Sequence, residues 1–187
     1  MTAGPDGSTF ADVTEVPYTR FARADDGLHI AYQTVGSGPT DVVLLPATPS
    51  IDLMWDQESY AHGLRRLAEL GRLICLDYRG TGASDPVPLG ALPTAETWAE
   101  DTRVVMDAVG STAAHIVCQG ASFLGILFAA THPERTRTLT LVDPSARTLR
   151  DEGYPGVSEQ VLESFIEWDS RTYGTPRDGI CAESRAR

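Results

Sequence analysis

Short, largely apolar runs alternate with amphipathic stretches along most of the chain. The runs Val42–Leu45, Leu73–Leu76 and Thr138–Val142 have the composition of strands in a parallel sheet. Between them, Tyr60–Gly71 and Thr94–Val109 repeat apolar residues at helical spacing. This alternation predicts an α/β domain, with a mostly parallel sheet that is covered by helices on both faces.

The first two predicted strands differ from the others. Tyr18–Ala24 and Leu28–Val35 each alternate apolar and polar residues, and the sequence Asp-Asp-Gly between them is a strong hairpin signal. We therefore expect these two strands to be antiparallel to each other.

The predicted helices carry recognisable end signals. Thr94 suits an N-cap, and Gly71 and Gly110 are expected to stop the helices that precede them. A last helix is predicted over Val157–Trp168, with Val161, Leu162, Phe165 and Trp168 on its apolar face.

The stretch His115–Pro133 joins a predicted strand to a predicted helix through a sharp turn. Its first four residues, His-Ile-Val-Cys, suit a buried strand, and Leu124, Leu127, Phe128 and Thr131 fall on one helical face. Strand, tight turn and helix are the layout of a nucleophile elbow, where G-x-S-x-G presents a serine at the tip of a sheet.

No serine stands at the expected apex of this turn. Counting back from the helix puts Gln119 there, whereas counting forward from the strand puts Gly120 there, between Cys118 and Ser122. We prefer Gly120, because the flanking residues must be small and a strained apex suits glycine. Ser122 itself is a third candidate, although it would place Leu124 where a small residue is needed. A strand-to-helix connection without chemistry is the remaining interpretation.

Two loops follow predicted central strands. The loop Pro46–Ser50 lies where an α/β fold places ligand contacts, and Ala47 or Thr48 could donate an oxyanion-hole amide there. The loop Asp77–Asp85 contains two glycines, but the third glycine of a dinucleotide-binding loop is absent and prolines follow in place of a helix. We therefore expect no dinucleotide site.

Composition narrows the classes of partner. The chain has 187 residues, 42% of them hydrophobic, and a net charge of -11. Such a charge argues against nucleic-acid and anionic-membrane surfaces, and no apolar run is long enough to span a bilayer. The N-terminus lacks the pattern of a signal peptide, so we expect a cytoplasmic protein. Cys75, Cys118 and Cys181 have no metal-like spacing, and neither a metal nor a cofactor is expected.

Several of these motifs together resemble the α/β-hydrolase superfamily. LDYRGTGASDP is similar to the loop after that fold's fourth strand, and FAATHPER is similar to the end of its nucleophile helix. The likeness covers about Tyr18 to Tyr173. AYQTVGSGP, VMDAVGS and SARTLRDEGYP followed by FIEW resemble hydrolase-like domains found alone or fused to bacterial class III adenylate cyclases. The resemblance implies an ester or other acyl hydrolase lineage and strands one to six of the fold.

The chain departs from that pattern in its catalytic residues. The resemblance implies a serine, then an acid, then a histidine from strands that follow a cap, and this chain ends where the cap would begin. We therefore expect a truncated form that is inactive by itself. Asp143, after the sixth strand, is a candidate acid without a histidine to orient. None of the four histidines falls on a loop at the catalytic end: His29, His62, His115 and His132.

These observations predict a tail over residues 1–16, a hydrolase-like core over 17–150, the start of a cap over 151–174 and a disordered tail over 175–187. The edge of Thr138–Val142 is expected to be uncovered and to favour self-association. Two functions stay open: a truncated hydrolase, or a non-catalytic module that binds an unidentified small molecule or regulates a partner. A cap and a loop histidine encoded beyond the stop codon would favour the first.

Overall fold

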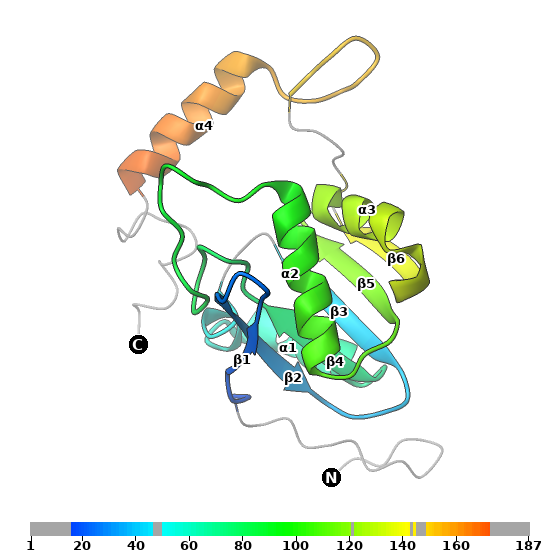
Figure 1. Cartoon of the computed structure of the whole chain (residues 1–187). Helices are drawn as coiled ribbons and strands as arrows, with labels where there is room; N and C mark the ends of the chain where they lie inside the picture. Colours follow the sequence, from blue (N-terminus) through cyan, green and yellow to red (C-terminus); the bar gives the residue numbers. More distant parts are fainter. Residues whose placement is uncertain (1–15, 47–49, 121, 143, 145–148, 173–187) are drawn as a thin grey trace. The chain divides into compact units, whose positions relative to one another are not determined.

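The computed structural model describes residues 16–46, 50–120, 122–142, 144 and 149–172. The chain divides after Pro144 into two compact units. The first unit is built on a six-stranded sheet with the order β1-β2-β4-β3-β5-β6 (Figure 1). The strands are β1 (Arg20–Arg23), β2 (His29–Val35), β3 (Asp41–Pro46), β4 (Arg72–Leu76), β5 (Ala114–Gln119) and β6 (Thr136–Val142).

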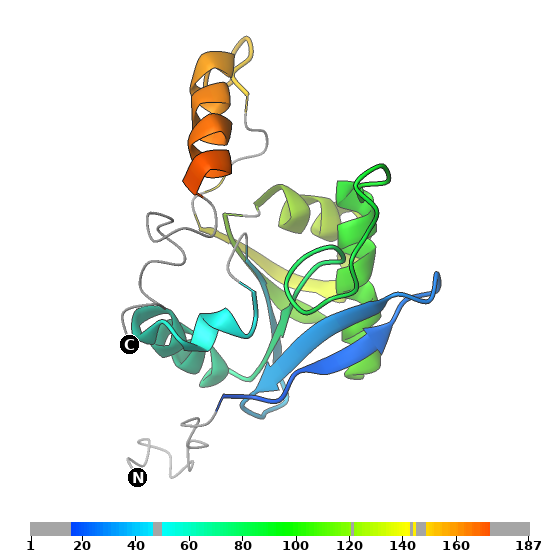
Figure 2. The same cartoon turned by 90° about the vertical axis from the view of Figure 1, so that its left-hand side faces the viewer.

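The pairing of the strands confirms the predicted fold class. β4, β3, β5 and β6 are parallel neighbours, whereas β1 pairs antiparallel with β2 and β2 pairs antiparallel with β4. Helix α1 (Glu58–Ala68) covers one face of the sheet, and α2 (Ala95–Ala108) and α3 (Ser122–Thr131) cover the other (Figure 2). Two short 3₁₀ turns, η1 (Leu53–Trp55) and η2 (Pro133–Arg135), complete the unit.

Each face of the sheet has its own apolar core. The core under α2 and α3 contains Ile116, Phe128 and Met106, all fully buried. The core under α1 contains Leu64 and Leu73, together with Met54 and Trp55 from η1. Successive residues of a strand contribute alternately to the two cores, because their side chains point to opposite faces of the sheet.

The predicted N-terminal cap of α2 is confirmed, whereas the predicted C-terminal stop of α1 is wrong. The hydroxyl oxygen of Thr94 accepts a hydrogen bond from the amide of Thr97, which is the N-cap geometry. Helix α1 ends at Ala68, so Gly71 is not its C-cap. A Cβ on Gly71 would lie 2.2 Å from the carbonyl oxygen of Thr40, and this close approach explains the glycine there.

The described part of the second unit, residues 149–172, contains a turn and one helix. Bridges join Leu149 to Val157 and Asp151 to Tyr154, and α4 (Glu159–Thr172) follows, beginning and ending later than predicted. Its apolar residues are largely exposed, including Phe165 and Trp168. The tails expected over 1–16 and 175–187 lie, apart from Val16, outside the described residues. Within the described part of the chain, no helix has the length and apolarity to cross a bilayer.

Candidate functional site

Three strand ends meet at the turn that follows β5. Pro46 lies beside Gln119 in the β3–β5 register, and Gln119 lies beside Val142 in the β5–β6 register. Gly120 forms a bridge with Pro46, and its amide donates a 3.4 Å hydrogen bond to the carbonyl of Val142. The φ of Gly120 is +72°, a left-handed conformation that glycine adopts without strain. Since α3 begins at Ser122, this turn is as tight as an elbow requires.

The other two apex candidates have different surroundings. Gln119 is exposed, and its side-chain oxygen accepts a 2.7 Å hydrogen bond from the hydroxyl of Tyr60 on α1. Ser122 is 1% exposed, and its hydroxyl has no hydrogen-bond partner among the described residues. A hydroxyl buried in this way is closed to a substrate that arrives from solvent.

The flanking Cys118 is packed against α3. Its side chain is fully buried, and burial raises the pKa of its thiol to about 11. A Cβ on Gly125 would lie only 2.0 Å from the Cys118 sulfur. The missing side chain of Gly125 therefore provides the space that the sulfur occupies. A buried neutral thiol of this kind is a packing group rather than a nucleophile.

The described residues on either side of the predicted oxyanion loop have defined partners. Ala47 and Thr48 lie outside the described residues, as does Asp143. Pro46 before them is paired with β5, and after them the hydroxyl of Ser50 and the amide of Ile51 donate to the Asp77 carboxylate at 2.9 and 3.0 Å.

Asp77 also organises the loop that follows β4. Its carboxylate accepts a 2.8 Å hydrogen bond from the amide of Ala83, and the hydroxyl of Ser84 donates to its carbonyl at 2.6 Å. A Cβ on Gly82 would lie 2.0 Å from Asp77 Oδ2, and Gly82 has a φ of +51°. Burial raises the pKa of Asp77 although these donors oppose the shift.

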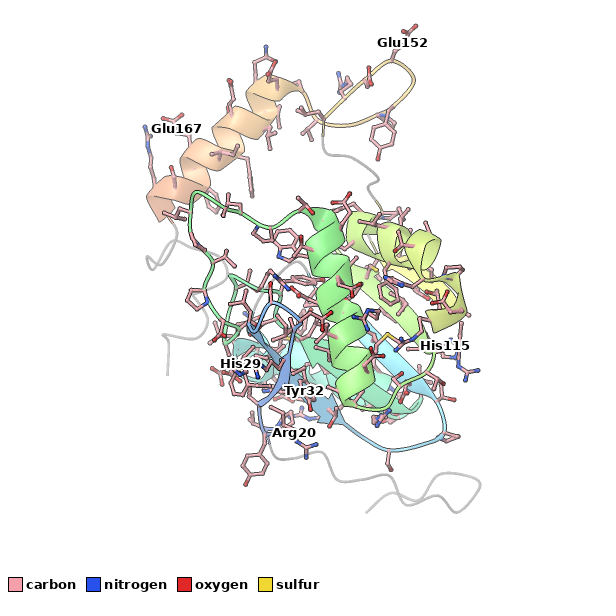
Figure 3. The ribbon with its side chains drawn as sticks, in the orientation of Figure 1. Arg20, His29, Tyr32, His115, Glu152 and Glu167 are labelled. Carbon is pink, nitrogen blue, oxygen red and sulfur yellow. The ribbon has the colours of Figure 1, made fainter. Side chains whose placement is uncertain are left out.

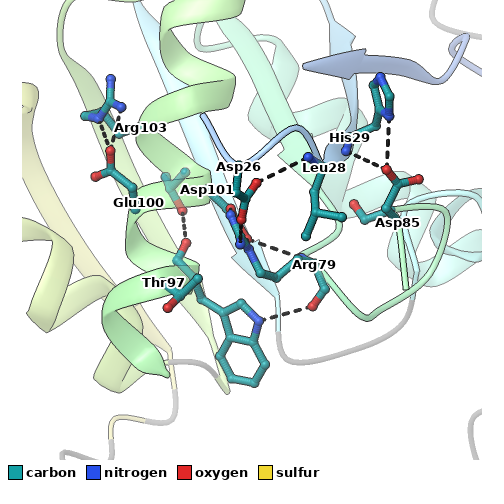
Figure 4. A network of polar contacts seen from close by, with 12 residues as sticks. Asp26, Leu28, His29, Arg79, Asp85, Thr97, Glu100, Asp101 and Arg103 are labelled. Carbon is teal, nitrogen blue, oxygen red and sulfur yellow. Dashed lines mark hydrogen bonds and ion pairs between the residues drawn. The ribbon is translucent and has the colours of Figure 1, made fainter. Parts of the chain in front are cut away.

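Arg79 ties the same loop to α2 and to the first hairpin (Figure 4). Its guanidinium contacts the fully buried Asp101 carboxylate at 2.6–3.0 Å and also reaches Asp26 at 2.5 Å. The indole of Trp98 donates to the carbonyl of Arg79 at 3.3 Å. Asp77, Arg79 and Ser84 of the Asp-x-Arg-Gly-x-Gly-x-Ser segment thus each have a structural partner, and the segment is a scaffold for the site.

Comparison with known proteins agrees with this architecture. An esterase from Exiguobacterium antarcticum superposes with a TM-score of 0.66 and 25% identity, over 82% of this chain and 56% of that one. A hydrolase from Pseudomonas aeruginosa PA01 gives a TM-score of 0.64 and 25% identity, with the same coverage. The chain has the α/β-hydrolase fold.

Sequence comparison extends the likeness to the α/β-hydrolase superfamily. A putative carbamate hydrolase, RutD, from Caulobacter segnis is 34% identical over 93 residues, which are 47% of this chain and 33% of that protein. No family model matches the sequence. The chain spans little more than half the length of the two solved hydrolases and about a third of the curated relative.

Catalysis in the hydrolase fold requires a histidine side chain that reaches the elbow. Two of this chain's four histidines, His29 and His115, lie on strands at positions far from it. His29 begins β2 at the same end of the sheet as the elbow, because β2 runs against β4. It is three strands from β5, about 14 Å at 4.8 Å per strand, and its Nδ1 lies 3.0 Å from Asp85. His115 is at the opposite end of β5, about 16 Å from Gly120 at 3.3 Å per residue, and contacts the Thr138 hydroxyl. Figure 3 shows both side chains, well separated.

The two helical histidines are no better placed. His132 follows α3, whose ten residues span about 15 Å, and it lies 3.7 Å from Glu100. His62 is exposed on α1, two residues after Tyr60, so the two side chains leave the helix on different sides. No group of three or more metal-binding side chains was found among the described residues.

Tyr60 is the site residue that sequence reasoning missed. Its phenol reaches the elbow from α1, and burial raises its pKa to about 12. It therefore stays protonated at neutral pH and acts as a hydrogen-bond donor rather than a base. The available signal was its position, one residue before the buried stripe Ala61, Leu64 and Ala68.

Proposed function

We propose that this chain is a hydrolase-fold module of ester or other acyl hydrolase descent, without ester turnover of its own, that binds a small molecule at the elbow. The observation that carries the proposal is Gly120, which holds the left-handed turn between β5 and α3 and has no side chain. Acyl transfer needs a nucleophile, a base and a group that orients the base. Gly120 offers no nucleophile, and the described histidines are engaged, distant or, for His62, directed away from the side of α1 that Tyr60 occupies.

The neighbouring groups do not replace the missing serine. Cys118 is buried, with a raised pKa, and the Ser122 hydroxyl is enclosed at the start of α3. What remains is a turn with the Tyr60–Gln119 hydrogen bond beside it, and with Ser50 and Ile51 hydrogen-bonded to the Asp77 carboxylate nearby in the fold. These features support recognition of a carbonyl or carboxylate at the elbow without cleavage of an ester.

Covalent labelling tests whether a serine nucleophile exists. The purified chain is incubated with a fluorophosphonate, and the intact mass is measured beside a Ser122→Ala variant and an active serine esterase. The proposal predicts no adduct on either form of this chain. A stoichiometric adduct that Ser122→Ala abolishes would overturn it.

The binding half of the proposal has its own test. Titration with a short-chain carboxylate such as butyrate should move the backbone amide resonances of Gly120 and Ser122 in a saturable way. Saturable shifts confined to residues far from the turn would contradict an elbow site.

A regulatory role toward a class III adenylate cyclase domain is a second candidate. Its support is the likeness of AYQTVGSGP and VMDAVGS to hydrolase-like domains that accompany such cyclases. Measuring the rate of a class III cyclase domain with and without the purified chain tests the idea. An unchanged rate at saturating chain concentration would exclude direct regulation of that domain.

A further inference from the structure

A cavity of about 460 Å³ opens at the end of the sheet opposite the elbow. It lies where β3, β4 and β6 begin and where the loop from α2 enters β5. Its size falls within the range of small-molecule sites, about 300–1,000 Å³. Its lining includes Ser37, Gly38, Asp41, Arg72, Thr112 and Arg137.

Two arginines and one carboxylate line this cavity. Arg72 is held by Asp41 through two hydrogen bonds of 2.8 and 2.9 Å and donates a third, of 2.9 Å, to the carbonyl of Val109. Arg137 donates through Nε to the carbonyl of Ala113 at 3.2 Å, and its two Nη groups have no partner among the described residues. One positive charge is therefore left uncompensated, in a chain whose net charge is -11.

The turn between β2 and β3 adds neutral donors. Gly36 and Gly38 have φ angles of +74° and +151°, and a Cβ on Gly36 would lie 2.6 Å from the carbonyl oxygen of Ala68. No hydrogen bond within the described structure uses the amides of Ser37 and Gly38. Free amides beside a guanidinium are the groups that hold oxyanions in proteins.

The geometry points to a second binding site here, for a small organic anion that carries a phosphate or carboxylate group. The planar guanidinium of Arg137 can give two parallel hydrogen bonds to such a group. The cavity is larger than one inorganic ion requires, so the ligand can extend beyond its anionic group. The hydroxyls of Ser37 and Thr112 line the cavity and can bind that remaining part. This site is separated from the elbow by the length of β5, so it is independent of the function proposed above.

Nuclear magnetic resonance titration of the full chain tests the site. The probes are inorganic phosphate, glycerol 3-phosphate and succinate, added at low salt to wild type and to Arg137→Gln, Thr112→Glu and Arg20→Gln. Arg20 is the matched control, because it is an exposed arginine on β1 at the far edge of the sheet (Figure 3). Thermal unfolding of each variant checks whether the fold is kept.

At least one probe should move the amides of Ser37, Gly38 and Thr112 saturably, and the stronger of the two organic probes identifies the preferred group. Arg137→Gln should weaken binding at least tenfold, or about 1.4 kcal/mol. Thr112→Glu should abolish binding by placing a carboxylate in the cavity, and Arg20→Gln should leave it unchanged. Absence of saturable shifts, or equal weakening by Arg20→Gln, would overturn the inference.

Discussion

The hydroxyl of Tyr60 on α1 donates a 2.7 Å hydrogen bond to the side-chain oxygen of Gln119, the last residue of β5. The bond joins a helix on one face of the sheet to the turn where the hydrolase fold carries its nucleophile. It requires a protonated phenol, and burial favours that form by raising the pKa of Tyr60 to about 12.

Stability should fall at alkaline pH for a related reason. Burial raises the pKa of Tyr60 from 10.0 to about 12, that of Cys75 from 9.0 to about 12 and that of Cys118 from 9.0 to about 11. Between each pair of values the folded chain holds a proton that the unfolded chain has lost, so these groups favour folding less as pH rises. Urea unfolding should show a free energy that decreases from pH 9 to pH 12. A free energy that rises across this interval would contradict the assignment.

Of the two carboxylate contacts of Arg79, the buried one with Asp101 should contribute more to the stability of the fold. Asp101→Asn leaves the Arg79 guanidinium without its fully buried partner and should cost about 3–5 kcal/mol. Asp26→Asn is the matched control, because the Asp26 side chain is 50% exposed, and it should cost at most about 1 kcal/mol. Chemical denaturation of both variants measures the difference. Equal costs would show that burial does not distinguish the two contacts.

The packing of α3 on β5 should depend on the absence of a side chain at Gly125. Gly125→Ala places a Cβ against the Cys118 sulfur and should destabilise the fold by about 1–3 kcal/mol. Cys118→Ala removes the clash, so the double variant should be more stable than the sum of the single changes predicts. Gly63→Ala is the control, since nothing lies within 4 Å of its added Cβ. Strict additivity in the cycle would refute the contact.

Self-association through β6 remains a prediction. β6 is the last strand of the described sheet, and Thr138, Thr140 and Val142 are exposed along it. An uncovered edge invites pairing with another chain, and a lysine at Thr140 should weaken that pairing. Light scattering over a concentration series should show dimers or larger species that Thr140→Lys reduces. A wild-type chain that stays monomeric at high concentration would count against this role.

The fold could be predicted largely because its signals are local. Apolar runs such as Val42–Leu45 and Leu73–Leu76 must be buried, and the Thr94 hydroxyl caps α2 from within the same segment. The sequence wrongly predicts a helix end at Gly71, since the true constraint on this glycine, the carbonyl of Thr40, lies 31 residues away in sequence.

The surroundings of the candidate site depend on contacts that a sequence pattern does not contain. Tyr60 and Gln119 are 59 residues apart, and no periodicity indicates that they meet. Arg72 and Arg137 likewise reach one cavity from two strands that are not neighbours.

The central claim, that this chain has an elbow without a catalytic serine or base, is tested most directly by hydrolysis of short-chain activated esters. Wild type, Gly120→Ser and Gln119→Ser are compared with heat-denatured samples and with an active serine esterase. Oxyanion stabilisation and binding alone give catalysis on the order of 10³–10⁴ over water, and only where substrate is held productively. We predict that all three forms hydrolyse the esters at the rate of their denatured controls, because no base is placed to activate a serine. Turnover by Gly120→Ser well above its control, lost again in Gly120→Ala, would show that a base reaches the elbow and would contradict the account.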